Sequence, residues 1–301
     1  MADMDMLQAA KSGDAKRVKV LIAEDPACIH VKDEDGNGPL HLAAIANYHA
    51  NSGHFEVVKR LVRAGADVNA PGFEDNIGQA PPVVLAAFSS PNNIETVRLL
   101  LRRGANPNGK SSKGHTPLLA AAEHGAHEIC DILLEKKATL DIHSAAALGK
   151  RLEARKMLRE DPDLVLDRDD YRRATPLYYA ALQNQRDLAE LLLSYEANLS
   201  AQTVQGDTAM HAAAAAPSRR TLEYLIEQGG DVNARNYKMQ TPLHFAVEEW
   251  WAEGSEVMHL LILHGANVHL RDENKQTPLV KAMQRNKTEL VSILKKAGAR
   301  E

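Results

Sequence analysis

The residues whose types and spacing could do chemistry are two histidines and a cysteine three residues apart: His124, His127 and Cys130. Imidazole and thiolate groups are zinc ligands, and two carboxylates lie beside them in the sequence. Gly125, however, interrupts the helix between the histidines, and Cys130 falls at an apolar core position of the helix that follows. These features favour a structural role, so we expect no metal site and no cofactor.

The sequence lacks the common motifs of catalytic sites. The chain has no Gly-x-Ser-x-Gly elbow, no Gly-x-Gly-x-x-Gly loop and no His-Glu-x-x-His pair, and we expect no phosphate-binding loop. Adjacent carboxylates such as Asp169 and Asp170 point apart and are typical of solvated surfaces. We therefore expect a protein that is not an enzyme, with no catalytic residues.

Composition and charge indicate which classes of partner and which cellular compartment to expect. Aromatic residues make up 4% of the 301 residues, and the formal net charge is −4 with no basic stretch that stands out. A nucleic-acid partner is therefore not expected. Cys28 and Cys130 lie far apart in apolar segments, which indicates buried thiols and a reducing compartment. Neither a signal peptide nor a membrane-spanning stretch is recognisable, so we expect a cytoplasmic monomer that binds no membrane.

The chain is organised around a repeated stretch, best seen as Thr241–Ala246 with the sequence Thr-Pro-Leu-His-Phe-Ala. Threonine suits a helix N-cap, proline the first helical position, and alanine a close helix contact. Copies are marked by the prolines at positions 39, 82, 117, 176, 242 and 278, with Ala209 in the equivalent place. The steps from Pro176 to Ala209 and from Ala209 to Pro242 are both 33 residues.

This motif and period resemble the ankyrin repeat, whose unit is a pair of helices followed by a hairpin finger. Gly65, Gly104, Gly230 and Gly265 stand where a left-handed turn would end the second helix and begin a finger. The resemblance implies an all-α fold, an α-solenoid of about nine ankyrin-like units with short hairpin fingers. We place the units near 4–35, 36–78, 79–113, 114–139, 140–170, 171–203, 204–236, 237–272 and 273–301.

One irregularity lies at residues 136–141. Only 24 residues separate Pro117 from the equivalent position at Asp141, so the fourth unit passes through Lys136–Thr139 without a finger. The fifth unit then matches the first at a constant offset of 136 residues, as in Glu24-Asp25-Pro26 and Glu160-Asp161-Pro162. We therefore expect two fused arrays, 1–139 (units 1–4) and 140–301 (units 5–9), each with a capping terminal unit.

Two insertions between helices add residues of the types that anchor interfaces. Asn47–His54 adds six residues, including Tyr48 and His49, and the eighth unit has a smaller insertion with Trp250 and Trp251. A tryptophan at such a place either contacts a partner or covers the edge of a neighbouring repeat, and the sequence leaves both readings open.

The family resemblance implies a binding surface formed by the finger tips and the exposed side of the first helices. The candidate partner-binding residues are Tyr48, His49, His115, Glu123, His124, Tyr171, Arg172, Arg173, Tyr237, Lys238, Met239, Glu248, Trp250, Trp251 and Lys275. The histidines at the fourth motif position, His41, His143, His211 and His244, are instead expected to brace the turn before the helix.

The function predicted from the sequence is a non-enzymatic interaction scaffold or adaptor that holds a protein partner on the concave face. Two alternatives remain open. One is a regulatory protein with a small-molecule or metal site at the junction of the arrays, lined by Glu123, His124, Lys136 and Lys137. The other is a structural subunit whose two similar halves associate with other copies.

Overall fold

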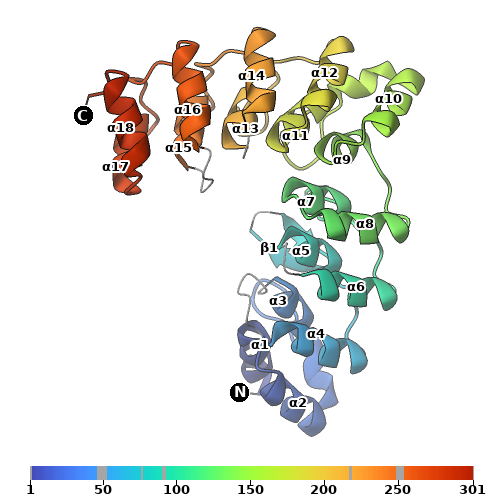
Figure 1. The fold of residues 1–301 in the computed structure, drawn as a ribbon. Helices are drawn as coiled ribbons and strands as arrows, with labels where there is room; N and C mark the ends of the chain where they lie inside the picture. Colours follow the sequence, from blue (N-terminus) through green and yellow to red (C-terminus); the bar gives the residue numbers. More distant parts are fainter. Residues whose placement is uncertain are drawn as a thin grey trace. The chain divides into compact units, whose positions relative to one another are not determined.

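The computed structural model describes residues 2–45, 53–75, 77–89, 93–216, 219–248 and 254–300. Over these residues the chain forms eighteen α-helices in nine consecutive pairs, with two short 3-10 helices and one two-stranded sheet (Figure 1). None of the helices within these ranges is long and apolar enough to cross a bilayer. The all-α repeat fold predicted from the motif is thereby confirmed.

Contacts within the chain divide it into two compact units, Met1–Leu140 and Asp141–Glu301. The first contains α1 (Ala2–Ser12), α2 (Ala15–Glu24), η1 (Pro26–His30), α3 (Pro39–Ile45), α4 (His54–Arg63), β1 (Gly72–Glu74), β2 (Gly78–Ala80), α5 (Pro82–Phe88), α6 (Ile94–Arg102), α7 (Pro117–Glu123) and α8 (His127–Glu135). The second contains α9 (Ile142–Ala147), α10 (Arg151–Glu160), η2 (Pro162–Leu166), α11 (Pro176–Leu182), α12 (Arg186–Ser194), α13 (Ala209–Ala215), α14 (Arg220–Glu227), α15 (Pro242–Glu248), α16 (Gly254–Leu263), α17 (Pro278–Gln284) and α18 (Thr288–Lys296).

Within each unit the first helices of successive pairs pack on one another, and most of the second helices also pack on their successors. We call them the inner and outer helices. Inner helices are short and rich in alanine, as in Ala209–Ala215, where six of the seven residues are buried. Small side chains allow neighbouring inner helices to approach closely, so the core of each unit runs continuously from one repeat to the next.

The threonine of the motif caps the inner helix in two ways. Thr116 and Thr277 accept a hydrogen bond at the side-chain oxygen from the N–H three residues later, at 3.1 and 3.3 Å. Where the fourth position is histidine, the imidazole takes part: Thr241 N–H donates to Nδ1 of His244 at 3.1 Å. Both arrangements satisfy a polar group at the helix start, and Pro117 and Pro278 then open their helices as the first residue.

Left-handed residues end the outer helices, as the sequence predicts for Gly65, Gly104 and Gly265, whose φ angles are 98°, 88° and 87°. The prediction is wrong by one residue at Gly230. There Gly229 takes the left-handed conformation, at φ 87°, while a Cβ on Gly230 would lie only 2.5 Å from the sulfur of Met210. The second glycine is therefore required by close packing.

Each finger of the second unit is a tight turn closed at its base by a backbone hydrogen bond. In the finger of residues 203–207, Thr203 N–H donates to the carbonyl of Asp207 and Gly206 N–H donates to the carbonyl of Thr203. This is the three-residue hairpin turn whose last residue is left-handed, a place that favours glycine. Gly206 has φ 83°, but the same place in two other fingers holds Met239 and Lys275, at φ 59° and 61°. The finger of residues 169–174 is one residue longer, and its last turn residue is Arg173, at φ 56°.

The fourth repeat has no finger, as predicted. Helix α8 ends at Glu135 and α9 begins at Ile142, and the connection is held by Asn108 of the preceding repeat. The Asn108 amide donates to the carbonyl of Lys137 at 3.2 Å and accepts from Thr139 N–H at 2.7 Å. Asn233 bridges Gly265 and Asn267 in the same way, so this contact between repeats continues where the finger is missing.

Removal of the Asn108 amide is expected to loosen the connection after α8. In Asn108→Ala the carbonyl of Lys137 and the N–H of Thr139 lose their partner, so amide exchange at residues 137–139 should accelerate, about ten-fold for one lost hydrogen bond. Hydrogen–deuterium exchange measures this, with Asn274→Ala at an exposed finger tip as control. Unchanged exchange at residues 137–139 would contradict the assignment.

Opposite effects on stability are expected at two equivalent turn residues. Gly206→Ala should lower the free energy of unfolding by about 1 kcal/mol or more, because a left-handed alanine is strained and its Cβ would lie 2.7 Å from Tyr237 N. Met239→Gly should raise it by about 0.5 kcal/mol, since relief of strain exceeds the entropy cost of glycine. Urea unfolding of both variants tests this, and a clear loss in Met239→Gly would refute the strain argument.

Candidate protein-interaction surface

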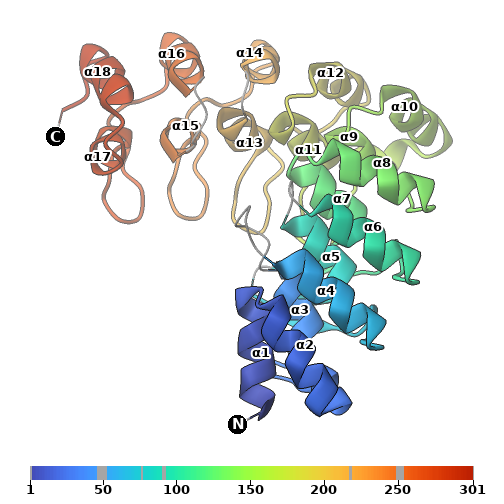
Figure 2. The same cartoon turned by 60° about the horizontal axis from the view of Figure 1, so that its bottom comes forward.

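The surface best suited to bind a partner is formed by the fingers of the second unit, which project beside the inner helices α13, α15 and α17 (Figure 2). We define the finger surface as residues 171–173, 204–205, 237–239 and 273–275. Adjacent fingers are joined by backbone hydrogen bonds: Val204 N–H donates to Arg172, Tyr237 N–H to Gln205, and Glu273 N–H to Lys238. The tips therefore form one connected row.

A polar side chain at the base of each finger sets the shape of its turn. Asp169 accepts hydrogen bonds from Tyr171 N, Arg172 N and Ala174 N, at 2.7, 2.6 and 2.7 Å. In the finger of residues 236–240, the Asn236 side chain accepts hydrogen bonds from Lys238 N and Gln240 N. These groups are buried, so each turn is fixed by contacts that a partner does not have to supply.

Asp272 caps the last finger and also forms an ion pair with Lys281 of α17, at 3.1 Å, with both groups buried. Burial opposes ionisation of Asp272, but the hydrogen bonds from Gln276 N–H and Lys281 outweigh it and lower the pKa of the carboxyl. The finger base is thus tied to the helix below it. This buried pair accounts for both charges without a ligand.

Arginine before the capping residue of three fingers, at Arg168, Arg235 and Arg271, gives the finger row a second support. Arg235 donates to the carbonyls of Met239 in its own finger and Arg271 in the next, at 3.4 and 2.5 Å. Arg168 spans two repeats in the same manner, donating to Arg173 and Gln202. This role was not predicted from the sequence, although the arginine three positions before Tyr171 recurs two positions before Tyr237.

Large side chains remain exposed at the tips. Tyr237 is 66% exposed, Val204 55% and Met239 42%, which is high for apolar residues on a rigid frame. Arg172 stacks on the Tyr171 ring at 5.0 Å, and both are partly buried. The predicted residues Arg173, Lys238 and Lys275 are exposed in the same row. Seven of the predicted contact residues therefore come together here, and Val204 joins them without having been predicted.

Two predicted contact residues of the first unit are buried. His115 is fully buried and Glu123 is 7% exposed, and their side chains contact each other at 2.8 Å between Nε2 and Oε2. Phe88 packs edge-on against both His115 and His124. The expectation that His115 and Glu123 present polar groups to a partner is therefore wrong, because they join a finger base to its inner helix. His124 stays exposed at the end of α7.

The remaining predicted contacts cannot be placed. Tyr48, His49, Trp250 and Trp251 lie outside the described residues, and Glu248 is described only as the last residue of α15. Their part in binding stays a prediction.

The motif histidines brace the chain as expected. Nδ1 of His211 accepts from Thr208 N–H at 3.1 Å, so Nε2 carries the proton and donates to the carbonyl of Gln240 at 3.1 Å. His244 makes the same pair of contacts with Thr241 and Gln276. Each ring joins its own helix cap to the next finger, which requires the neutral tautomer.

Burial lowers the pKa of His211, although the hydrogen bond to the Gln240 carbonyl raises it. The same balance lowers the pKa of His41, which contacts the Ala70 carbonyl. A proton on Nδ1 would face the N–H that this nitrogen now accepts. The structure therefore favours the neutral ring by geometry as well as by burial.

The residues that suggested metal chemistry are not assembled into a site. Cys130 is buried in α8, and His127 is exposed at the start of that helix. Over the described part of the chain, no three His, Cys, Asp or Glu side chains form a group that could hold a metal ion. The apolar position predicted for Cys130 agrees with its burial.

One stretch has the residue spacing of a phosphate-binding loop, although no such loop is expected from the sequence. Gly104–Ser111 reads Gly-Ala-Asn-Pro-Asn-Gly-Lys-Ser, but a phosphate loop needs a strand before it and a helix after it. Here Gly104 follows helix α6, and Ser111 caps a finger turn by accepting from His115 N–H. The match therefore lacks the structure that cradles a phosphate.

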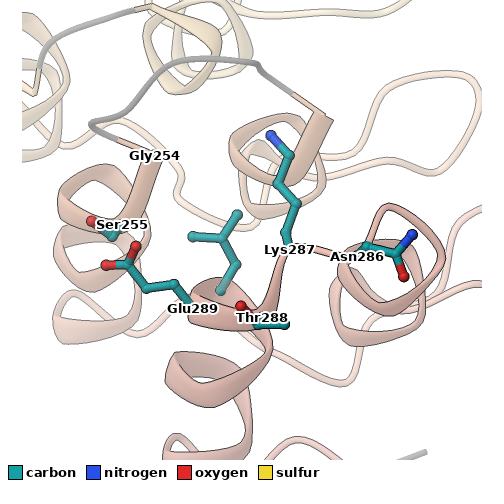
Figure 3. Close-up of a pocket in the computed structure, with 7 residues that line it drawn as sticks. Gly254, Ser255, Asn286, Lys287, Thr288 and Glu289 are labelled. Atoms are coloured by element: carbon teal, nitrogen blue, oxygen red, sulfur yellow. The ribbon is translucent and has the colours of Figure 1, made fainter.

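A depression of about 260 Å³ lies where α16 and α18 begin (Figure 3). It is lined by Gly254, Ser255, Asn286, Lys287, Thr288, Glu289 and Leu290. Its side chains come from the ends of two neighbouring helices and include both an acid and a base, without a convergent set of polar groups. It gives less support to a binding site than the fingers do.

Stability is expected to fall in mild acid because of the braced histidines. An unfolded histidine takes up a proton near pH 6.5, whereas His211 in the folded chain does so only at lower pH. Below about pH 6.5 the unfolded state therefore binds more protons, and the free energy of unfolding falls by up to about 1.4 kcal/mol per pH unit for each such ring.

Thermal unfolding between pH 7.5 and 5.5 tests this expectation. His211→Gln should lower the melting temperature at pH 7.5 and reduce its dependence on pH, whereas His264→Gln, at an exposed residue after α16, should do neither. A pH dependence unchanged by His211→Gln would show that this ring is not the source.

Comparison with known proteins agrees with this architecture. Residues 48–144, 83–203 and 142–236 each match the family description "Ankyrin repeats (3 copies)", and residues 239–273 match "Ankyrin repeat". A mouse B-cell lymphoma 3 protein homolog is 27% identical over 228 residues, which cover 71% of this chain and 49% of that protein.

Two further relatives are much longer than this chain. Human inversin is 26% identical over 247 residues, covering 80% of the chain and 20% of inversin. The E3 ubiquitin-protein ligase KEG of Arabidopsis thaliana is 25% identical over 287 residues, covering 88% and 17%. The chain thus spans about half or less of these relatives. Repeat motif, paired helices, fingers and family matches together show that the chain belongs to the ankyrin repeat family.

Proposed function

We propose that this protein is a non-enzymatic scaffold or adaptor that holds a protein partner on its fingers and inner helices. The ankyrin repeat family is generally non-catalytic, and its relatives here support a role in protein–protein interaction. The observation that carries the proposal is the finger surface, where Arg173, Met239 and Lys275 project from left-handed turn residues.

The left-handed conformation costs an ordinary residue about 1–2 kcal/mol, and glycine avoids that cost. Gly36, Gly114 and Gly206 occupy the equivalent place in other fingers, which shows that the turn itself needs no side chain there. Arg173, Met239 and Lys275 are exposed, so contacts within the fold do not offset the strain. An exposed side chain retained at such a place is available for contact with another molecule.

The neighbouring residues supply what such a contact needs. Tyrosine and arginine anchor interfaces because they bury large areas at small entropic cost, and Tyr237 and Arg173 stand in the same row. Base caps and cross-finger hydrogen bonds hold the row before a partner arrives. Little conformational entropy is then lost on binding.

Loss of two exposed tip side chains should abolish partner capture without affecting folding. We expect Tyr237→Ala/Met239→Ala to retain at most a tenth of the wild-type yield of a captured protein, because both are large side chains with apolar surface exposed in the row. Affinity capture from native lysate with quantitative mass spectrometry measures the yield. The two substitutions leave the buried finger caps intact.

A matched control removes exposed apolar chains from outer helices, as Leu152→Ala/Leu263→Ala, at residues 76% and 79% exposed. It should capture the partner as wild type does. Equal capture by the tip variant and wild type, with both folded by circular dichroism, would exclude the finger surface as the binding site.

A further inference from the structure

We propose that the finger surface binds an extended acidic segment of its partner, with apolar residues between the acids. This inference rests on the proposed function and adds the chemistry of the ligand. It is drawn from the charges that remain exposed, the position of the exposed apolar chains and the spacing of the fingers.

The charges that face outward are mostly positive. Arg173, Lys238 and Lys275 are exposed at three tips, and Arg172 lies beside the first of them. The outward acids in these fingers are Asp167, Asp170, Asp231 and Glu273. Arg235 and Arg271, exposed behind the tips, add positive charge even though they donate to backbone carbonyls.

The acids at the bases of three fingers are withdrawn from the surface. Asp169, Asp207 and Asp272 are buried at 8%, 4% and 5% exposure. The carboxylates of Asp169 and Asp272 accept hydrogen bonds from backbone N–H groups of their own turns, and that of Asp207 accepts from the side-chain amide of Asn236. The chain is negative overall, so a positive row is a local arrangement that favours a negative ligand.

Apolar residues lie in the middle of the row. Val204 and Tyr237 belong to neighbouring fingers, and Tyr237 rests on Gly206: a Cβ at Gly206 would lie 2.8 Å from the Tyr237 ring. The ring is thus held on one side by the backbone while 66% of the residue stays exposed. A ring fixed in this way is a preorganised anchor for an apolar side chain.

The spacing of the fingers fits an extended peptide. Each repeat contributes one finger, and packed helices of neighbouring repeats lie about 8–10 Å apart. Three residues of extended chain span about 10 Å. An acidic residue at every third position would therefore meet Lys238 and Lys275 in successive fingers, while apolar residues between them reach Tyr237 and Met239.

A nucleic-acid strand fits this surface less well. Phosphates would approach Asp170 and Glu273, which alternate with the cations along the row. A peptide can place neutral residues opposite these acids, whereas every nucleotide carries a charge. We therefore assign a peptide, and a competing oligonucleotide becomes one outcome of the test.

The test uses the full chain and a fluorescein-labelled peptide of four Glu-Leu-Ser triplets, followed by anisotropy. We expect the peptide to bind about ten-fold more tightly than its Gln-Leu-Ser counterpart, and more weakly as salt rises. Lys238→Gln/Lys275→Gln should weaken binding about five-fold, as expected for two exposed ion pairs. Lys156→Gln/Arg159→Gln, on outer helix α10, removes the same charge and should change nothing.

Three results would overturn the inference: equal affinity for the Glu and Gln peptides, an equal loss in the α10 variant, or tighter binding of oligo(dT) than of the Glu peptide. Failure here is distinct from failure of the proposed function. If capture of a native partner depends on Tyr237 and Met239 but the Glu peptide does not bind, the scaffold stands and the acidic ligand is rejected.

Discussion

The structure depends on burial that no single repeat can achieve. An inner helix of about two turns, such as Ala209–Ala215, buries its alanines only when helices α11 and α15 pack on its two sides. A helix of this length is unstable in isolation, because nucleation costs more than a few hydrogen bonds return. The repeats therefore stabilise one another, and every feature that joins neighbours, from His211 to Asn233, adds to the same cooperative contact.

Hydrogen bonds between repeats fix the register of this packing. Alanine faces are smooth and would allow neighbouring pairs to slide, whereas the imidazole of His211 has one donor and one acceptor and meets both only in one position. Asn233 adds a second fixed point at the other end of the finger. The fingers inherit this register, so their tips are placed by contacts far from the tips themselves.

Much of the fold could be predicted from the sequence because its signals are local. In a Thr-Pro-Leu-His stretch the threonine indicates the helix cap, the proline the first helical residue, and the histidine the side chain that braces the turn. A glycine such as Gly65 or Gly265 marks the end of a helix. The burial of His115 could not be predicted in this way. It results from contacts with Glu123, eight residues later in the sequence, and with Phe88 of the preceding repeat, and the residues next to His115 give no sign of either contact. The strain at Met239 was equally hidden, because φ is not visible in a residue type.

The strain at Met239 shows that the residue most favourable for stability is not always the one found at the tip of a finger. Stability favours glycine as the last turn residue, as at Gly206. The side chains of Thr203 and Asn236 cap the same type of turn, with glycine as its last residue in one finger and Met239 in the other. A side chain at this place projects from the outermost point of a turn that buried hydrogen bonds already hold rigid. We therefore expect substitution at Met239 or Lys275 to alter the contacts that the row offers to the proposed partner while the repeat beneath it stays folded, because the hydrogen bonds that form the turn use Asn236 and Asp272 and not these side chains.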